Sequence, residues 1–261
     1  MNLLDLGILA LVEGAADALA VDSSAHSLLA ARLLHLRATP VAAALHLGMA
    51  LALAAYFWRD MRLIGNGLWK LRKLRVEPGT WLLLKMLTAS LPPIVALAWL
   101  GKFGPQFGDL LFTGIDTVIF AALMLLTDRL SLTVKRIEHI GAGTTVSVGL
   151  LQLAALLPGV GRSAAALTMA RVFGMERQDA YRFTLLVSLP ILLAQAIGEF
   201  ADNGRRGHSA GLPDLLACGL AFFAVLLAVS LGFSLIRRAG LMPVVIYRLF
   251  FGAALIGLGL L

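Results

Sequence analysis

The sequence is short of charged residues and almost without cysteine. Asp, Glu, Lys and Arg make up only 14% of the 261 residues, whereas a soluble domain carries about 25%. This shortage excludes an ordinary soluble globular fold. The single cysteine, Cys218, excludes both an intrachain disulfide and a metal site built from several cysteines. Because Cys218 lies in an apolar run, we expect it to serve packing.

In place of charge the chain has hydrophobic residues, which make up 59% of the sequence and give a mean hydropathy of +0.88. This composition is typical of an integral membrane protein. The net charge of +7 would indicate a nucleic-acid partner in a soluble protein. Here the basic residues cluster between apolar runs, which favours cytoplasmic loops beside anionic lipid. We therefore expect a membrane, and no nucleic acid, as partner.

Six apolar segments have about the 20 residues that a bilayer-spanning helix needs. They cover residues 41–58, 81–100, 110–126, 181–199, 215–236 and 242–261. Two more apolar regions, 3–36 and 141–173, are each broken midway by a polar string, so each is interpreted as two short helices that enter the membrane and return. The first 20 residues lack a basic beginning and are not expected to be a cleaved signal peptide. The predicted fold is an all-α integral membrane protein with six transmembrane helices and two re-entrant hairpins.

The two broken regions are copies of one another. A shift of 139 positions places Glu13 on Gln152, Ser23 on Arg162 and Ser24 on Ser163. Each copy is followed by three spans, and because three is odd, the second half would have inverted topology. We expect one polytopic domain over residues 1–261, with halves of about 1–130 and 140–261, whose two hairpins meet near the middle of the membrane.

Charge supports this topology. The loop predicted after the first span contains a run of basic residues and is expected to be cytoplasmic: Arg59, Arg62, Lys70, Arg72, Lys73 and Arg75. Further basic residues predicted on that side are Arg129, Lys135, Arg136, Arg171, Arg177, Arg237 and Arg238. The opposite side would have fewer, namely Arg32, Arg37, Lys102, Arg205 and Arg206.

The first polar string contains two acids on one helix face. Glu13 and Asp17 are four residues apart, and two carboxylates in an apolar environment repel one another unless a cation lies between them. Oxygen ligands favour Mg²⁺ or Ca²⁺. The alternative is a helix end near water, with two solvated acids.

The same string continues with hydroxyls and a histidine where the hairpin should turn. Ser23, Ser24 and His26 lie close together, and a histidine beside a hydroxyl is suited to act as base, acid or nucleophile. The alternative is helix capping by Asp22 or Ser23, with His26 facing the lipid headgroups. His46, in the next span, is expected either to pack or to line the site.

The second polar string has the composition of an anion-binding turn. It runs from Gln152 to Ser163 and ends with Pro158-Gly159-Val160-Gly161-Arg162-Ser163. Gly159 and Gly161 would allow close approach of the backbone, the helix that starts near Ser163 would present N–H groups, and Arg162 would bind phosphate through two donors. The alternative is a structural turn with an incidental arginine. The two strings together predict an intramembrane site for a phosphorylated lipid.

At these residues the chain resembles the undecaprenyl-pyrophosphate phosphatase family, also called bacitracin-resistance proteins. The family pattern E-G-x-T-E-F-L-P-V-S-S-T-G-H corresponds to residues 13–26, and P-G-x-S-R-S corresponds to residues 158–163. Similarity continues in order along nearly the whole chain. Departures from the two patterns include Asp17 for glutamate, Ala20 for proline, Asp22 for serine, Ala25 for glycine and Gly161 for serine.

The resemblance implies a membrane hydrolase that converts undecaprenyl pyrophosphate to the monophosphate, so that the carrier is reused for cell-wall synthesis. It implies a bacterial inner membrane location, a site open to the periplasmic side and a divalent cation. Carried over residue by residue, Glu13 and Asp17 would hold the metal and Ser23 or His26 would be the nucleophile or its proton-transfer partner. Arg162 and Ser163 would bind phosphate with Gly159, Gly161 and Ser24, and Asp22, His46 and Gln152 would line the site.

Three alternatives concern function and assembly. Inverted repeats with broken helices are also typical of transporters, so a non-hydrolytic transporter or flippase of polyprenyl phosphate, or of another phosphorylated lipid, is the second hypothesis. A scaffold without a ligand is disfavoured, because acids and Arg162 within apolar sequence are costly. The chain is also predicted to be able to form a homodimer.

Overall fold

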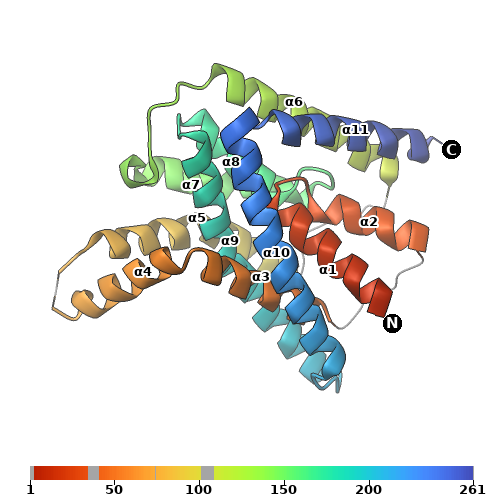
Figure 1. Ribbon diagram of the computed structural model, residues 1–261, viewed down its shortest axis with the longest axis horizontal. Helices are drawn as coiled ribbons and strands as arrows, with labels where there is room; N and C mark the ends of the chain where they lie inside the picture. The colour runs from red at the N-terminus through yellow and green to blue at the C-terminus, as the bar shows by residue number, and fades with distance from the viewer. Residues whose placement is uncertain (1–2, 35–40, 74, 101–108, 261) are drawn as a thin grey trace.

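The computed structural model describes residues 3–34, 41–73, 75–100 and 109–260. This part of the chain is helical, and its only β-type pairing is an isolated bridge between Lys135 and Met175. In chain order the helices are α1 (Leu3–Ala18), α2 (Ser23–Leu34), α3 (Ala42–Tyr56), α4 (Trp58–Leu71), α5 (Pro78–Leu100), α6 (Leu110–Leu130), η1 (Ile137–His139), α7 (Ala142–Leu151), η2 (Gln152–Leu156), α8 (Arg162–Val172), α9 (Arg177–Arg205), α10 (Leu212–Ala239) and α11 (Met242–Gly259) (Figure 1).

Five of the described helices are long and apolar enough to cross a membrane, namely α5, α6, α9, α10 and α11. The pair α3 and α4 is a sixth candidate, bent by 84° at the break between the two helices. Large side chains of these helices point outward, including Trp99, Leu227 and Phe250, which are 88%, 72% and 75% exposed. Such exposure suits contact with lipid rather than water. The prediction of an all-α integral membrane protein is confirmed.

The segment after the first span differs from the prediction. Residues 58–71 form helix α4 and not a loop. The helix is amphipathic: it buries Asp60, Ile64 and Gly67 and exposes its basic residues. Gly67 lies so close to α5 that a Cβ atom there would come within 2.6 Å of the backbone nitrogen of Thr80. The run of basic residues obscured a helix that tertiary contact with α5 stabilises.

Both broken regions form pairs of helices, as predicted. In the first, α1 ends at Ala18 and α2 begins at Ser23. In the second, α7 ends at Leu151, η2 continues to Leu156 and α8 begins at Arg162. The starts of α2 and α8 are 139 residues apart (162 − 23), which is the shift found in the sequence.

The packing of the helices follows the repeat. Helix α1 packs on α10, and its counterpart α7 packs on α5. Likewise α3 packs on α10 while α9 packs on α5, and α6 lies beside α11 (Figure 1). Each half therefore places its broken pair against a long helix of the other half, as two interlocked copies require. The boundaries of the halves stay a prediction.

Candidate active site

The turns of the two broken pairs share one backbone conformation. Ala20 and Asp22 have φ values of 58° and 71°, and Gly159 and Gly161 have values of 92° and 76°. A shift of 139 residues relates each first position to its counterpart, 20 to 159 and 22 to 161. Residues other than glycine seldom adopt positive φ, so the first turn must be held by its surroundings, whereas glycine suits this conformation in the second turn.

Arg248, on α11, is one of the groups that hold the turns. It is fully buried, and it donates hydrogen bonds to the carbonyl oxygens of Ala20 (3.3 Å), Gly159 (2.7 Å) and Val160 (2.9 Å). Asp22 is the other group, and its carboxylate accepts a hydrogen bond from the Gly159 backbone nitrogen at 2.9 Å. The turns therefore meet inside the helical bundle, whereas their position near the middle of the membrane stays a prediction.

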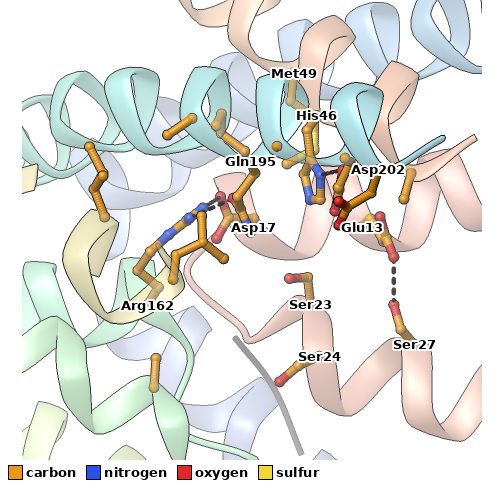
Figure 2. A pocket seen from close by; sticks show the side chains of 18 of the residues that line it. Glu13, Asp17, Ser23, Ser24, Ser27, His46, Met49, Arg162, Gln195 and Asp202 are labelled. Carbon is orange, nitrogen blue, oxygen red and sulfur yellow. Dashed lines mark hydrogen bonds and ion pairs between the residues drawn. The ribbon is translucent and has the colours of Figure 1, made fainter. Parts of the chain in front are cut away.

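Beside the turns lies a cavity of about 670 Å³ with a polar wall. Figure 2 shows three groups of side chains around it: Arg162 with Asp17 and Gln195, Glu13 with His46 and Asp202, and the serines of α2. These side chains come from α1, α2, α3, α8 and α9, so both repeat halves build the cavity. The polar residues of the lining are Glu13, Asp17, Asp22, Ser23, Ser24, Ser27, His46, Arg162, Gln195, Glu199, Asp202 and Arg205.

Arg162 is held in place at the first residue of α8. Its Nη2 donates to Asp17 Oδ2 at 3.0 Å and its Nη1 to Gln195 Oε1 at 2.9 Å. The other oxygen of Asp17 accepts from the hydroxyl of Ser163 at 2.8 Å. The side chain of Arg162 is only 9% exposed. A buried cation aligned in this way is suited to stabilise charge on a phosphoryl group in the cavity.

Glu13, unlike Asp17, has only one carboxylate oxygen that accepts a hydrogen bond. Its Oε1 accepts a bond from Ser27 at 3.4 Å, whereas its Oε2 is buried without a hydrogen-bond partner. Nearby, His46 Nδ1 lies 2.7 Å from Glu199 Oε2. His46 thus lines the site, which was one of the two alternatives that the sequence left open.

Glu13 and Asp17, which were predicted to hold a metal ion together, do not form one metal site. Within the described residues, no group of three or more His, Cys, Asp or Glu side chains is arranged to hold a metal ion. Both oxygens of Asp17 already accept bonds from Arg162 and Ser163, so Asp17 and Glu13 do not form a shared pair of free ligands. The orphaned Oε2 of Glu13 does fit a cation, because a buried carboxylate oxygen requires a donor or a positive charge.

The three residues expected at the first turn take different places. Ser23 lines the cavity, and its hydroxyl makes no hydrogen bond to another described residue. The hydroxyl of Ser24 donates to Asp22 at 2.7 Å. His26 is outside the lining: Nδ1 contacts the Asp22 carbonyl oxygen and Nε2 contacts the hydroxyl of Tyr247, both at 2.6 Å, while the ring stacks on Phe251. The prediction of His26 at the reacting atoms is not met by this location.

The predicted anion-binding turn is occupied from within the protein. The N–H group of Gly159 faces the carboxylate of Asp22, and Gly161 lies against the Cβ atom of the same residue. Neither glycine lines the cavity, so the prediction that they bind phosphate is not supported, whereas Arg162 does line it. The prediction that Gln152 lines the site is wrong. Gln152 is buried away from the cavity, and its amide nitrogen donates to the Ala89 carbonyl oxygen at 3.0 Å.

The sequence reasoning missed one wall of the site. Gln195, Glu199 and Asp202 on α9 all line the cavity. They follow one another at spacings of four and three residues, which places them on one helix face. Polar residues at this spacing near the end of an apolar span were the signal that would have found them.

Comparison with known proteins agrees with these features. A family model described as bacitracin resistance protein BacA matches residues 6–254. Undecaprenyl-diphosphatase 1 of Rhodospirillum rubrum is 37% identical over 272 residues, which cover 100% of this chain and 96% of that protein. Undecaprenyl-diphosphatase 1 of Paramagnetospirillum magneticum is 34% identical, covering 99% and 98% of the two chains. Undecaprenyl-diphosphatase of Ruegeria pomeroyi is 32% identical, covering 99% of each chain.

These matches extend over nearly the whole chain and include both turns and the helices that line the cavity. The protein therefore belongs to the bacitracin resistance protein BacA family.

Proposed function

We propose that this protein hydrolyses undecaprenyl pyrophosphate to undecaprenyl phosphate and inorganic phosphate, returning the lipid carrier to cell-wall synthesis. The observation that carries the proposal is the cavity in which Ser23 and Arg162 line one space, in a chain whose full-length relatives are named undecaprenyl-diphosphatase. A hydroxyl and a buried guanidinium are the groups that phosphoryl transfer requires.

The hydroxyl of Ser23 is the proposed nucleophile. Its oxygen attacks the terminal phosphorus, the bond from that phosphorus to the bridging oxygen breaks, and the bridging oxygen leaves with undecaprenyl phosphate. A carboxylate of the cavity accepts the serine proton. Water then attacks the phosphorus of the phosphoserine, the bond from that phosphorus to the serine oxygen breaks, and the serine oxygen takes back the proton from the carboxylic acid as inorganic phosphate is released. Arg162 stabilises the charge on the phosphoryl oxygens in both steps.

Glu13 is the residue proposed to hold a divalent cation, Mg²⁺ or Ca²⁺, through its free Oε2. Such a cation would neutralise charge on the pyrophosphate. Asp17 serves in this proposal to orient Arg162 rather than to bind the metal.

The Glu13→Gln variant tests the role of Glu13. It keeps the size of the side chain and its bond to Ser27 but removes the negative charge. We expect phosphate release from undecaprenyl pyrophosphate to fall at least about 100-fold, and EDTA to abolish release by the unaltered protein. The matched control is Glu138→Gln, at an exposed residue of η1. Full activity of Glu13→Gln would contradict the assignment.

The function itself is tested by incubating purified protein in detergent with undecaprenyl pyrophosphate and measuring free phosphate. Release is expected. Binding of the lipid without release would refute the proposal and favour a carrier.

The protein is a multi-pass membrane protein, and the proposed location is the bacterial inner membrane with the cavity open to the periplasm. Arg136, Arg177, Arg182 and Arg237 gather around a second cavity at the N-terminal end of α9. Basic residues favour the cytoplasmic side. The site cavity lies along the opposite, C-terminal part of α9, between Leu192 and Arg205. A homodimer stays a prediction.

A further inference from the structure

Asp22 has more hydrogen bonds than the cap of one helix requires. Within α2, its Oδ1 accepts from the backbone nitrogen and the hydroxyl of Ser24, at 3.1 and 2.7 Å, and its Oδ2 accepts from the Ala25 nitrogen at 3.3 Å. The same Oδ2 also accepts from the Gly159 nitrogen at 2.9 Å, across the boundary between the repeat halves. One carboxylate therefore caps α2 and joins the two turns.

Gly161 makes this contact possible. A Cβ atom at residue 161 would lie 2.8 Å from the Cβ and 3.0 Å from the Cα of Asp22. These separations are too short for real carbon atoms, and the φ value of 76° is itself unfavourable for a residue with a side chain. The turns approach as closely as they do only because residue 161 is glycine.

Both residues directly precede groups of the active site. Asp22 is followed by Ser23 and Gly161 by Arg162, and these two lie at the starts of α2 and α8. Contact between residues 22 and 161 therefore sets how Ser23 and Arg162 are placed relative to one another. A small displacement of reacting groups lowers a catalytic rate strongly.

The family pattern has serine at both positions, and this chain has aspartate and glycine. We propose that Asp22 is a positioning residue of the phosphatase, and that Asp22 and Gly161 act as one unit that joins the two re-entrant turns and aligns Ser23 with Arg162. This inference rests on the proposed function. It assigns to the Pro158–Ser163 turn an internal carboxylate as its anion, so that the phosphate of the substrate binds at the side chain of Arg162 and not in the turn.

If Asp22 instead served to repel the substrate, the opposite change in kinetics would be expected on its removal. An anion beside the cavity would repel pyrophosphate, and its removal would then lower KM and raise kcat/KM. The structure opposes this role because Asp22 is 5% exposed and both its oxygens face N–H or O–H donors. Its charge is already compensated by these donors and by the nearby guanidinium of Arg248.

The Asp22→Asn variant separates two roles of Asp22: the contact of Asp22 with Gly159 and Gly161 that joins the two turns, here called the joint, and the capping of α2. Asparagine is as good a helix cap as aspartate, but it has one acceptor oxygen and so fails to serve Ser24 and Gly159 together. We expect kcat for phosphate release to fall about tenfold or more, with KM changed less than about threefold. The matched control is Asp109→Asn, which caps α6 through the Leu111 nitrogen. A lower KM with a higher kcat/KM in Asp22→Asn would overturn the proposal.

The Gly161→Ala variant tests the same unit from the other side. Its Cβ atom pushes the turns apart, so kcat should again fall about tenfold or more. If the two residues act together, the double variant Asp22→Asn/Gly161→Ala is expected to be as active as the less active of the two single variants. Either substitution alone already breaks the contact between the turns, so the second has nothing further to remove. Effects that multiply would show independent roles and overturn the proposal. Gly143→Ala, where a Cβ atom meets no neighbour within 4 Å, is the control.

Thermal unfolding in detergent makes the test independent of activity. The unaltered protein, the two single variants and the double variant form a cycle of four proteins. The fall in unfolding midpoint of the double variant should be smaller than the sum of the falls of the two single variants, because the contact between the turns exists whether or not substrate is bound. If the unaltered protein releases no phosphate but the midpoints couple, the proposed function fails and the joint stands. If it releases phosphate and the midpoints are additive, the joint fails and the function stands.

Discussion

Phosphate release from undecaprenyl pyrophosphate is expected to fall about 100- to 1,000-fold when Arg162 is replaced by alanine. The buried guanidinium donates to Asp17 and Gln195 and lines the cavity. Preorganised donors of this kind stabilise the charge of the transition state, so kcat should fall more than KM rises. The measurement is a steady-state phosphate-release assay on purified protein.

Two variants make the result specific. Arg162→Lys keeps the charge but loses the planar fork, and it fails to hold Asp17 and Gln195 together, so activity should remain low. Arg129→Ala, at an exposed arginine near the end of α6, should be unaffected. If Arg162→Lys retained full activity, a positive charge alone would be sufficient at this position, and the planar guanidinium of Arg162 would not be needed.

The Arg248→Met variant is expected to show the largest loss of stability. It leaves three buried carbonyl oxygens, those of Ala20, Gly159 and Val160, without this donor. Each buried acceptor left without a donor costs about 1–3 kcal/mol, so we expect the free energy of unfolding to fall by about 3 kcal/mol or more. The midpoint of thermal unfolding in detergent should fall by about 10 °C.

Arg248 also has an effect on the site, since it holds both turns that place Ser23 and Arg162. Activity at low temperature, where the variant is still folded, should therefore fall as well. Arg129→Ala again serves as control for the loss of one positive charge. An unchanged midpoint in Arg248→Met would mean that water replaces the guanidinium at the three carbonyls.

The helices could be predicted from the sequence because apolar length is a local property. Five long helices and two broken pairs lie where hydropathy and the polar strings placed them. Helix α4 was missed since its basic side chains are typical of a loop. Its close contact with α5 at Gly67 and its ion pair between Asp60 and Arg182 are long-range features.

The site could be predicted in part. Glu13, Asp17, Ser23, His46 and Arg162 line one cavity, as a shared ligand site requires. His26 and Gln152 do not, although both stand in the same polar strings. Which of several neighbouring polar side chains turns toward a cavity depends on partners far away in the chain, such as Tyr247 for His26 and Ala89 for Gln152.

The sequence by itself determined that this protein is a helical membrane protein with two related polar turns, because hydrophobic length and the 139-residue repeat are properties of the linear chain. Only the tertiary structure decided what those turns do. It showed that Asp17 pairs with Arg162, that Glu13 keeps a free oxygen, and that Asp22 occupies the glycine turn. A buried polar group must find a partner in three dimensions, and the spacing of residues along one chain does not say which partner that will be.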